Sequence, residues 1–348
     1  MTDGSSNNQF GSKVSVCIPT HNGAAYLRQA IESVRAQSYR DFELLIVDDD
    51  SSDDTIQIVE EFARLDSRIR VHRNPLRLGL AGNWNRCLEL ARGEWIKFLF
   101  QDDYLRPNCV ELLLDLAERT GATLLAGQRD LEFDASLPTE YKNSFVRYVV
   151  ENELAGRFPS ATGAISAAEF AAHAALYPSL NCIGEPTVVM FHHSVLERFG
   201  RFNPELRQLV DWEYWMRIAV NDGLHYLDES LATFRVHRHA ATFSTMKEPL
   251  ILDRLIILHD IVYDPLYLPV RRAAQQMQPA IDLKQNLFSL CRALQPERAG
   301  QSGSLTLDEW NAIVRKYPRL RFPQFNYLMA RGLNKLKSQL KTHKRATS

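Results

Sequence analysis

The sequence lacks the features that would assign it to a membrane-spanning, secreted or nucleic-acid-binding class. None of its apolar runs is long enough to span a bilayer, and the polar start over residues 1–10 has no hydrophobic segment of a signal peptide. The formal net charge of −1 gives no basic field for binding nucleic acid. These absences predict a cytoplasmic protein with no nucleic-acid partner.

Cysteine is scarce, and its spacing suits neither disulfides nor zinc. There is no CxxC pair among the five cysteines, which are Cys17, Cys87, Cys109, Cys182 and Cys291. An odd number of widely spaced cysteines argues against a disulfide framework and against a zinc site. Reduced thiols are therefore expected.

The glycine-rich motifs that hold phosphates in many α/β proteins are also missing. No GxGxxG follows the first predicted strand, and no GxxxxGK[ST] occurs in the chain. A nucleotide would have to be held differently, for example through a divalent cation with carboxylates around it.

What is present is an alternation of strand and helix patterns. Strands are expected at 14–18, 42–47, 69–71, 95–100 and 123–126, with helices at 27–34, 56–63, 84–91 and 109–119. This order predicts an α/β fold with a mostly parallel sheet flanked by helices. Residues 128–165 are poorly periodic and are interpreted as a long loop or an inserted region.

The second half of the sequence predicts further strands and helices, followed by a region that is helical only. We expect a helix at 167–176, a strand at 187–191, a helix from 210, and strands at 224–227 and 231–236. From Pro249 onward the pattern is helical. The predicted organisation is a disordered tail over 1–12, one α/β domain over 13–245, and a helical C-terminal extension over 246–348.

Acid clusters follow two of the predicted strands. Asp48, Asp49 and Asp50 come after the second strand, and Asp102 and Asp103 come after the strand at 95–100. The carboxyl ends of parallel strands face the ligand crevice, so these acids are placed to hold a cation and a nucleotide. The alternative is ordinary turn acids, which is favoured for Asp48 and Asp50.

Four motifs, in order, resemble those of family 2 glycosyltransferases, which have the GT-A fold. They lie at 14–23, 42–53, 93–103 and 211–217 and span about residues 13–240. The third resembles the family's metal motif, usually written DxD, and the fourth its acceptor motif. Gln101 departs from the family pattern, since many members carry Asp two positions before the final acid.

The resemblance implies a donor site. Asp49 would contact the nucleotide base, Asp102 would lie near the ribose or sugar, and Asp103 would be the firm ligand of Mn²⁺ or Mg²⁺, with His237 reaching the metal or diphosphate. Pro19, Thr20, Asn22 and Arg77 would line the nucleotide pocket. For Asn22 the sequence also allows a helix cap.

The resemblance also implies an acceptor site. Asp211 would be the general base, and Glu185 and Trp212 would border the acceptor. The alternatives are a helix-dipole partner for Asp211 and core packing for Trp212.

The end of the chain predicts a basic amphipathic helix. Apolar residues from Phe325 to Leu340 share one helical face, and lysines and arginines from Arg331 to Arg345 supply positive charge. Such a helix can lie on an anionic membrane surface. Docking on the catalytic domain, or on a second copy in a homodimer, is the alternative and is slightly favoured.

Together these features predict an inverting, metal-dependent transfer of sugar from a nucleotide-diphosphate sugar to a hydroxyl. The acceptor implied by the resemblance is a glycan or lipid-linked glycan of a bacterial surface polysaccharide, handled in the cytoplasm or at the inner membrane face. Two alternatives remain: a sugar nucleotidyltransferase, and a non-catalytic nucleotide- or glycan-binding module.

Overall fold

The computed structural model describes residues 11–158, 163–238, 240, 250–294 and 306–320. The chain divides into two compact units, Met1–Glu248 and Pro249–Ser348. The predicted basic helix near the C-terminus and residues 1–10 of the predicted tail lie outside the described residues. Ser12, which was assigned to that tail, instead begins the first strand. In the described part of the chain, no helix has both the length and the apolar character needed to cross a bilayer.

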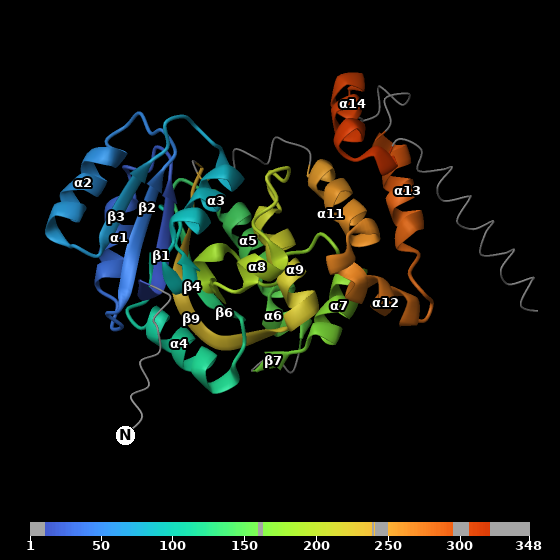
Figure 1. The fold of residues 1–348 in the computed structure, drawn as a ribbon, viewed down its shortest axis with the longest axis horizontal. Coiled ribbons are helices and arrows are strands. Elements are labelled where there is room, and N and C mark those ends of the chain that lie inside the picture. Colours follow the sequence, from blue (N-terminus) through green and yellow to red (C-terminus); the bar gives the residue numbers. More distant parts are fainter. Residues whose placement is uncertain (1–10, 159–162, 239, 241–249, 295–305, 321–348) are drawn as a thin grey trace, which may run out of the picture. The chain divides into compact units, whose positions relative to one another are not determined.

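The first unit begins with alternating strands and helices (Figure 1). These elements are β1 (Ser12–Thr20), α1 (Leu27–Arg35), β2 (Phe42–Asp48), α2 (Thr55–Leu65), β3 (Ile69–Arg73), α3 (Leu80–Leu90), β4 (Gly93–Phe98), β5 (Tyr104–Leu105), α4 (Cys109–Thr120) and β6 (Leu124–Phe133). The predicted pattern explains why they form: every residue of β2 is buried, and α1 buries Leu27, Ala30, Ile31 and Val34 on one face.

The unit continues with shorter elements around one long helix and one long strand. These are α5 (Thr139–Asn152), α6 (Leu154–Arg157), β7 (Ala164–Ile165), α7 (Ala167–Leu176), a 3₁₀ turn η1 (Pro186–Val188), β8 (Val189–His192), α8 (Val195–Phe199), α9 (Val210–Asp222) and β9 (Leu224–Val236).

Within the described residues, nine strands form one sheet with the order β3-β2-β1-β4-β8-β6-β9-β5, and β7 pairs with β9. The pairs β1–β2, β2–β3 and β1–β4 are parallel, whereas β8 is antiparallel to β4 and to β6. The predicted α/β sheet is confirmed, and its second half is mixed.

The strand order reverses direction between β1 and β4. From β1 the chain moves outward to β2 and β3, and then α3 carries it back to β4 on the other side of β1. Right-handed connections therefore place α1 and α2 on one face of the sheet and α3 on the opposite face. In such sheets the ligand crevice lies outside the carboxyl ends of the strands at this reversal.

Several predicted elements differ from the structure. Residues 128–165 are not a long loop, because β6 extends to Phe133 and α5 occupies 139–152. The two strands expected at 224–227 and 231–236 form the single strand β9. Strand β4 ends at Phe98, and the expected strand at 187–191 begins as the 3₁₀ turn η1. Periodicity missed α5 because seven of its residues from 143 to 151 are exposed.

The second unit is helical where it is described. It contains α11 (Ile251–Tyr263), a 3₁₀ turn η2 (Pro265–Tyr267), α12 (Leu268–Gln276), α13 (Leu283–Leu294), α14 (Leu307–Lys316) and a 3₁₀ turn η4 (Pro318–Leu320). Leu255, Ile257, Ile261 and Leu287 are among its buried side chains.

Gly93 at the start of β4 provides a test of the close pairing between β1 and β4. A Cβ atom at this position would lie 2.3 Å from the backbone nitrogen of Ser15. Because backbone cannot swing aside, we expect Gly93→Ala to lower the free energy of unfolding by about 1–3 kcal/mol. Urea unfolding measures the change. Gly163→Ala is the matched control, since a Cβ there meets nothing within 4 Å. Equal stability of the two variants would contradict the described pairing.

Candidate functional site

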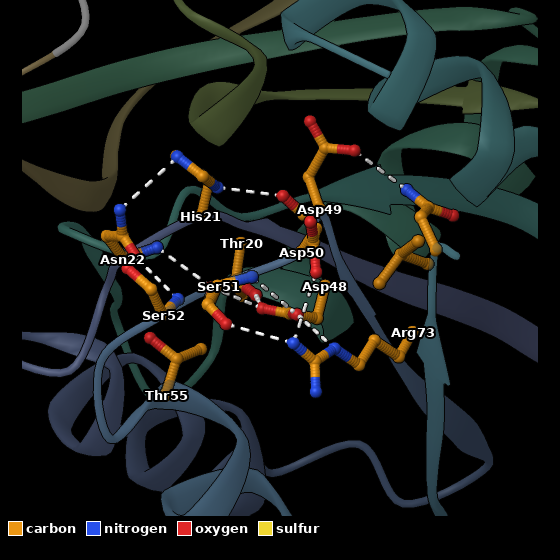
Figure 2. Close-up of polar contacts among 12 residues, drawn as sticks. Thr20, His21, Asn22, Asp48, Asp49, Asp50, Ser51, Ser52, Thr55 and Arg73 are labelled. Atoms are coloured by element: carbon orange, nitrogen blue, oxygen red, sulfur yellow. Dashed lines mark hydrogen bonds and ion pairs between the residues drawn. The ribbon is translucent and has the colours of Figure 1, made fainter. Parts of the chain in front are cut away.

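The loop after β1 and the turn after β2 are joined by a dense set of hydrogen bonds (Figure 2). The Thr20 hydroxyl donates to Asp48 Oδ1 at 3.1 Å, and the Asp49 amide donates to the Thr20 carbonyl at 2.8 Å. Thr20 is 1% exposed and Pro19 is buried. Both predicted pocket residues are therefore buried, Thr20 binds the end of β2, and their contact with a nucleotide stays a prediction.

Asn22 connects the same two segments and does not cap a helix. Its backbone adopts a φ of 48°, its amide donates to Ser51 Oγ at 2.9 Å, and its Oδ1 accepts from the Ser52 amide at 2.9 Å. The residue at the N-cap position of α1 is Tyr26. The cap interpretation of Asn22 is therefore wrong, whereas its role beside a nucleotide stays a prediction.

The three acids after β2 have different contacts. Asp48 is fully buried, and its Oδ2 accepts from the Ser51 amide at 3.0 Å. Asp50 has a φ of 58° and contacts Arg73 at 3.2 Å on the surface. Both contacts are those of turn acids, which was the favoured interpretation. Figure 2 shows the Asp49 side chain extending away from Asp48.

Asp49 binds the loop that leads into α3. Its Oδ1 accepts from the Leu78 amide at 2.7 Å and from Asn74 Nδ2 at 3.0 Å, and its Oδ2 accepts from the Gly79 amide at 2.9 Å. Gly79 is the N-cap of α3 and has a φ of 76°, which favours glycine. A carboxylate at this helix end is also stabilised by the helix dipole. Asp49 is 2% exposed, and its contact with a nucleotide base stays a prediction.

Arg77 lies in the loop that Asp49 holds. Its side chain is exposed at the edge of this region. No hydrogen bond or ion pair fixes it among the described residues, so its contact with a nucleotide stays a prediction.

Gln101 joins the ends of β1 and β4. The His21 amide donates to Gln101 Oε1 at 2.9 Å, and Gln101 Nε2 donates to the His21 carbonyl at 3.2 Å. An aspartate at this position could accept the first hydrogen bond but has no donor for the second. The departure from the family pattern at Gln101 therefore has a structural role: the side chain bridges two strand ends at the crevice.

Asp102 and His237 meet at the end of the central strands. His237 Nε2 lies 3.0 Å from Asp102 Oδ2, and the Asp102 side chain is 18% exposed. His237 follows β9, and its ring packs against Tyr26 with centroids 4.8 Å apart. The two predicted donor-side residues are thus brought together.

Asp103 points into the protein. It is 2% exposed, its Oδ2 accepts from the Thr187 hydroxyl at 2.6 Å, and its Oδ1 accepts from the Arg235 amide at 2.9 Å. Burial raises the pKa of this carboxyl to about 8, and a bound cation would lower it. The role of Asp103 as the firm metal ligand stays a prediction, and the more open Asp102 is a second candidate ligand.

Arg235 fixes the backbone around both acids. Its Nη1 donates to the Asp102 carbonyl at 2.7 Å, its Nε to Glu132 Oε1 at 3.0 Å, and its Nη2 to Gln29 Oε1 at 2.7 Å. The guanidinium also lies 4.5 Å from the centre of the Tyr26 ring. Sequence reasoning missed Arg235, because nothing in the pattern of β9 distinguishes it from a surface arginine.

Asp211 lies at the amino end of α9 beside the turn that precedes η1. Asn181 Nδ2 donates to Asp211 Oδ2 at 3.2 Å and to the Gly184 carbonyl at 3.2 Å. Asn181 Oδ1 accepts from the Ile183 and Gly184 amides at 3.1 and 3.0 Å. Asn181 therefore joins the predicted base to the turn that carries Glu185.

Glu185 and Trp212 have different environments. Glu185 Oε2 lies 2.6 Å from Arg129 Nε, and the Glu185 side chain is 23% exposed. Trp212 is 0% exposed, and its indole nitrogen donates to the Pro178 carbonyl at 3.0 Å. The acceptor assignment of Trp212 is therefore wrong, because its ring is enclosed in the core. Glu185 stays a prediction.

The donor set at Asp102 suits a hard divalent cation that shares its ligands with a substrate. Among the described residues, no cluster of three or more His, Cys, Asp or Glu side chains forms a complete cage. Mg²⁺ is commonly held by one or two carboxylates together with substrate phosphates, and Mn²⁺ accepts oxygen and imidazole ligands. One carboxylate and one imidazole fit this arrangement.

Comparison with known proteins gives the family. The sequence model described as Glycosyl transferase family 2 matches residues 15–179. An uncharacterized protein of Mycobacterium tuberculosis is 33% identical over 258 residues, covering 73% of this chain and 76% of that protein. The chain belongs to glycosyl transferase family 2. Membership in this family favours sugar transfer over the nucleotidyltransferase alternative.

Two further comparisons define how far the likeness within glycosyl transferase family 2 extends. The GalNAc(5)-diNAcBac-PP-undecaprenol β-1,3-glucosyltransferase of Campylobacter jejuni is 35% identical over 130 residues, covering 37% of this chain and 42% of that enzyme. The mannosyltransferase PcManGT of Pyrobaculum calidifontis, solved with GDP-Man and Mn²⁺, has a TM-score of 0.52 at 16% identity, over 94% of this chain and 88% of that one. The second likeness establishes a common GT-A fold.

The loop held by Asp49 can be tested without a substrate. In Asp49→Asn the new amide NH₂ would face the N–H donor of Leu78 or of Gly79, which leaves a partly buried donor without its acceptor. We expect a loss of about 1–3 kcal/mol in the free energy of unfolding, measured in urea. Asp50→Asn is the control, because Asp50 is exposed and Asn tolerates its positive φ. If the two variants had the same free energy of unfolding, the hydrogen bonds of Asp49 would not contribute to stability.

Proposed function

We propose that this protein is an inverting glycosyltransferase that moves a sugar from a nucleotide-diphosphate sugar to a hydroxyl of a glycan or lipid-linked acceptor. One observation carries the proposal. A single turn, residues 181–187, contacts Asp103 through Thr187 and Asp211 through Asn181. One predicted donor acid and the predicted base therefore contact opposite ends of one short segment, which supports transfer between two substrates.

On the donor side, we assign Asp102 and His237 to hold Mn²⁺ or Mg²⁺ together with the diphosphate. When bound, the cation stabilises the negative charge that develops on the departing diphosphate. Asp49, Thr20 and Asn22 shape the crevice in which the nucleoside would lie. Gln101 helps to hold the ends of β1 and β4 together, which would keep the nucleotide at a constant distance from the cation.

On the acceptor side, we assign Asp211 as the general base. A sugar hydroxyl has a pKa far above neutrality, so it must lose its proton as it attacks the anomeric carbon. The Asp211 carboxylate would take that proton, and the new glycosidic bond would form as the bond to the diphosphate breaks. Direct displacement of this kind inverts the anomeric configuration.

The acceptor class follows from relatives and from the sequence. The Campylobacter relative named above is described as acting on an undecaprenol-diphosphate glycan. A lipid-linked glycan of a bacterial surface polysaccharide is therefore the acceptor that we propose. The predicted basic helix near the C-terminus would suit contact with an anionic membrane at its inner face.

The cation assignment gives the first test of function. Asp102→Asn keeps the shape of the side chain but removes its charge, so Mn²⁺-dependent affinity for UDP or GDP should fall at least about tenfold, with little change in EDTA. Titration calorimetry with and without Mn²⁺ measures both values. Asp50→Asn is the matched control. Retained metal dependence in Asp102→Asn, with its loss in Asp103→Asn, would return the ligand role to Asp103.

The base assignment gives the second test. Asp211→Asn should lower kcat about 10²–10⁴-fold and leave donor affinity unchanged, because the amide cannot take the proton. The assay is release of nucleoside diphosphate in the presence of an acceptor, after a panel of nucleotide sugars has been screened for metal-dependent thermal stabilisation. Asp228→Asn, at an exposed carboxylate of the same unit, is the control. Loss of donor binding in Asp211→Asn would refute the base role, and absence of transfer with every donor would favour a binding module.

A further inference from the structure

Lys97 is a buried lysine in the centre of the sheet. It lies in β4, opposite Val16 of β1 and Met190 of β8, and its exposed fraction is 0%. Burial lowers the pKa of its ammonium to about 8. Among the described residues, no carboxylate forms an ion pair with it. The ammonium instead donates hydrogen bonds to backbone carbonyl groups.

The carbonyl groups that receive the Lys97 ammonium come from two segments. One is the Phe98 carbonyl at the end of β4, at 2.8 Å. The others belong to η1: the Thr187 carbonyl, in a short hydrogen bond, and the Pro186 carbonyl at 3.4 Å. The ammonium therefore connects the strand that leads to Asp102 with the turn that lies between the donor and acceptor sides.

Packing alone does not account for a lysine at this position. Moving an ammonium out of water costs several kcal/mol, even when hydrogen bonds replace part of its hydration. A methionine has similar length and would fill the same space without that cost. What methionine cannot do is donate hydrogen bonds to the two η1 carbonyls.

The segment that Lys97 holds has contacts on both sides of the candidate site. The Thr187 hydroxyl donates to Asp103 Oδ2 at 2.6 Å and also lies 3.4 Å from the Phe100 amide. Earlier in the same segment, Glu185 pairs with Arg129, and Asn181 contacts Asp211. A displacement of η1 would therefore change the position of the acceptor-side groups relative to the donor-side strand.

We propose that Lys97 is a positioning residue that fixes the acceptor-side turn against the donor-side strand by hydrogen bonding to the Pro186 and Thr187 carbonyls. This inference rests on the proposed function for its effect on turnover, but the structural link can be measured without activity. Misplacement of reacting groups by about 1 Å can cost about 10²-fold in rate. Loss of the link should therefore reduce kcat and leave donor affinity intact.

The variant that tests the proposal is Lys97→Met in the full-length protein. We expect kcat to fall about 10- to 100-fold, while the dissociation constant for UDP or GDP with Mn²⁺ changes less than about threefold. Amide hydrogen exchange in residues 181–188 should become faster. Ile96→Val is the matched control, because it removes one methyl group from the buried residue next to Lys97 in β4, whose side chain points to the opposite face of the sheet.

Thr187→Val provides a second test, combined with Lys97→Gln if Lys97→Met folds poorly. Thr187→Val removes the hydroxyl that reaches Asp103 and keeps the shape of the side chain. If Lys97 and Thr187 act through the same turn, the double variant should lose less kcat than the product of the two single losses. Independent, multiplicative losses would overturn the proposal.

The outcomes separate this inference from the proposed function. The role of Lys97 would be overturned if amide hydrogen exchange in residues 181–188 were as slow in Lys97→Met as in the unaltered protein. It would also be overturned if kcat of Lys97→Met equalled that of Ile96→Val. Either result would leave the glycosyltransferase proposal standing. Absence of transfer by the unaltered protein with every donor would refute the proposed function. Faster exchange confined to the turn would in that case still support the link made by Lys97.

Discussion

The reversal of strand order at β1 and β4 is the constraint on which the candidate site depends. Parallel strands on either side of the reversal end at the same edge, so Thr20, Asp48 and Asp102 are brought to one edge of the sheet from distant parts of the sequence. Gln101 then holds the two central strand ends together through the backbone of His21. This side-chain link extends the backbone pairing of β1 with β4 beyond the last paired residues, Cys17 and Phe98.

Burial divides the adjacent acids of this crevice into different roles. Asp102 retains access to solvent and meets His237, whereas Asp103 is enclosed by Thr187 and the Arg235 backbone. Asp49 binds the loop before α3, while Asp48 and Asp50 shape their turn. A carboxylate that accepts several hydrogen bonds organises the protein around it, and one that is partly open can exchange its partner for a ligand. The same residue type thus serves as scaffold and as candidate site.

Much of the fold was predictable, and the errors have physical causes. The strands from β1 to β4 and the helices between them are buried on regular faces, so periodicity identified them. Helix α5 is largely exposed and has no such face. The clustering of Asp102 with His237 followed from motif order, but the orientation of Asp103 did not, because adjacent side chains leave the backbone in different directions. Trp212 was mistaken for an acceptor residue because the sequence alone does not show whether a tryptophan next to Asp211 is buried or exposed.

Arg235 and Lys97, which sequence reasoning missed, share one property with Gln101, which it noted only as a departure from the family pattern. All three bind backbone groups. Gln101 binds the amide and carbonyl of His21, Arg235 binds the carbonyl of Asp102, and Lys97 binds carbonyls of β4 and η1. Backbone groups are the same for every residue type, so such contacts leave no pairing signal in a single sequence. A transferase must align two substrates to within a fraction of an ångström, and we propose that side chains bound to backbone segments contribute to that alignment without touching either substrate. The polar residues buried beneath this crevice are therefore better understood as supports for its geometry than as reserves of chemical reactivity.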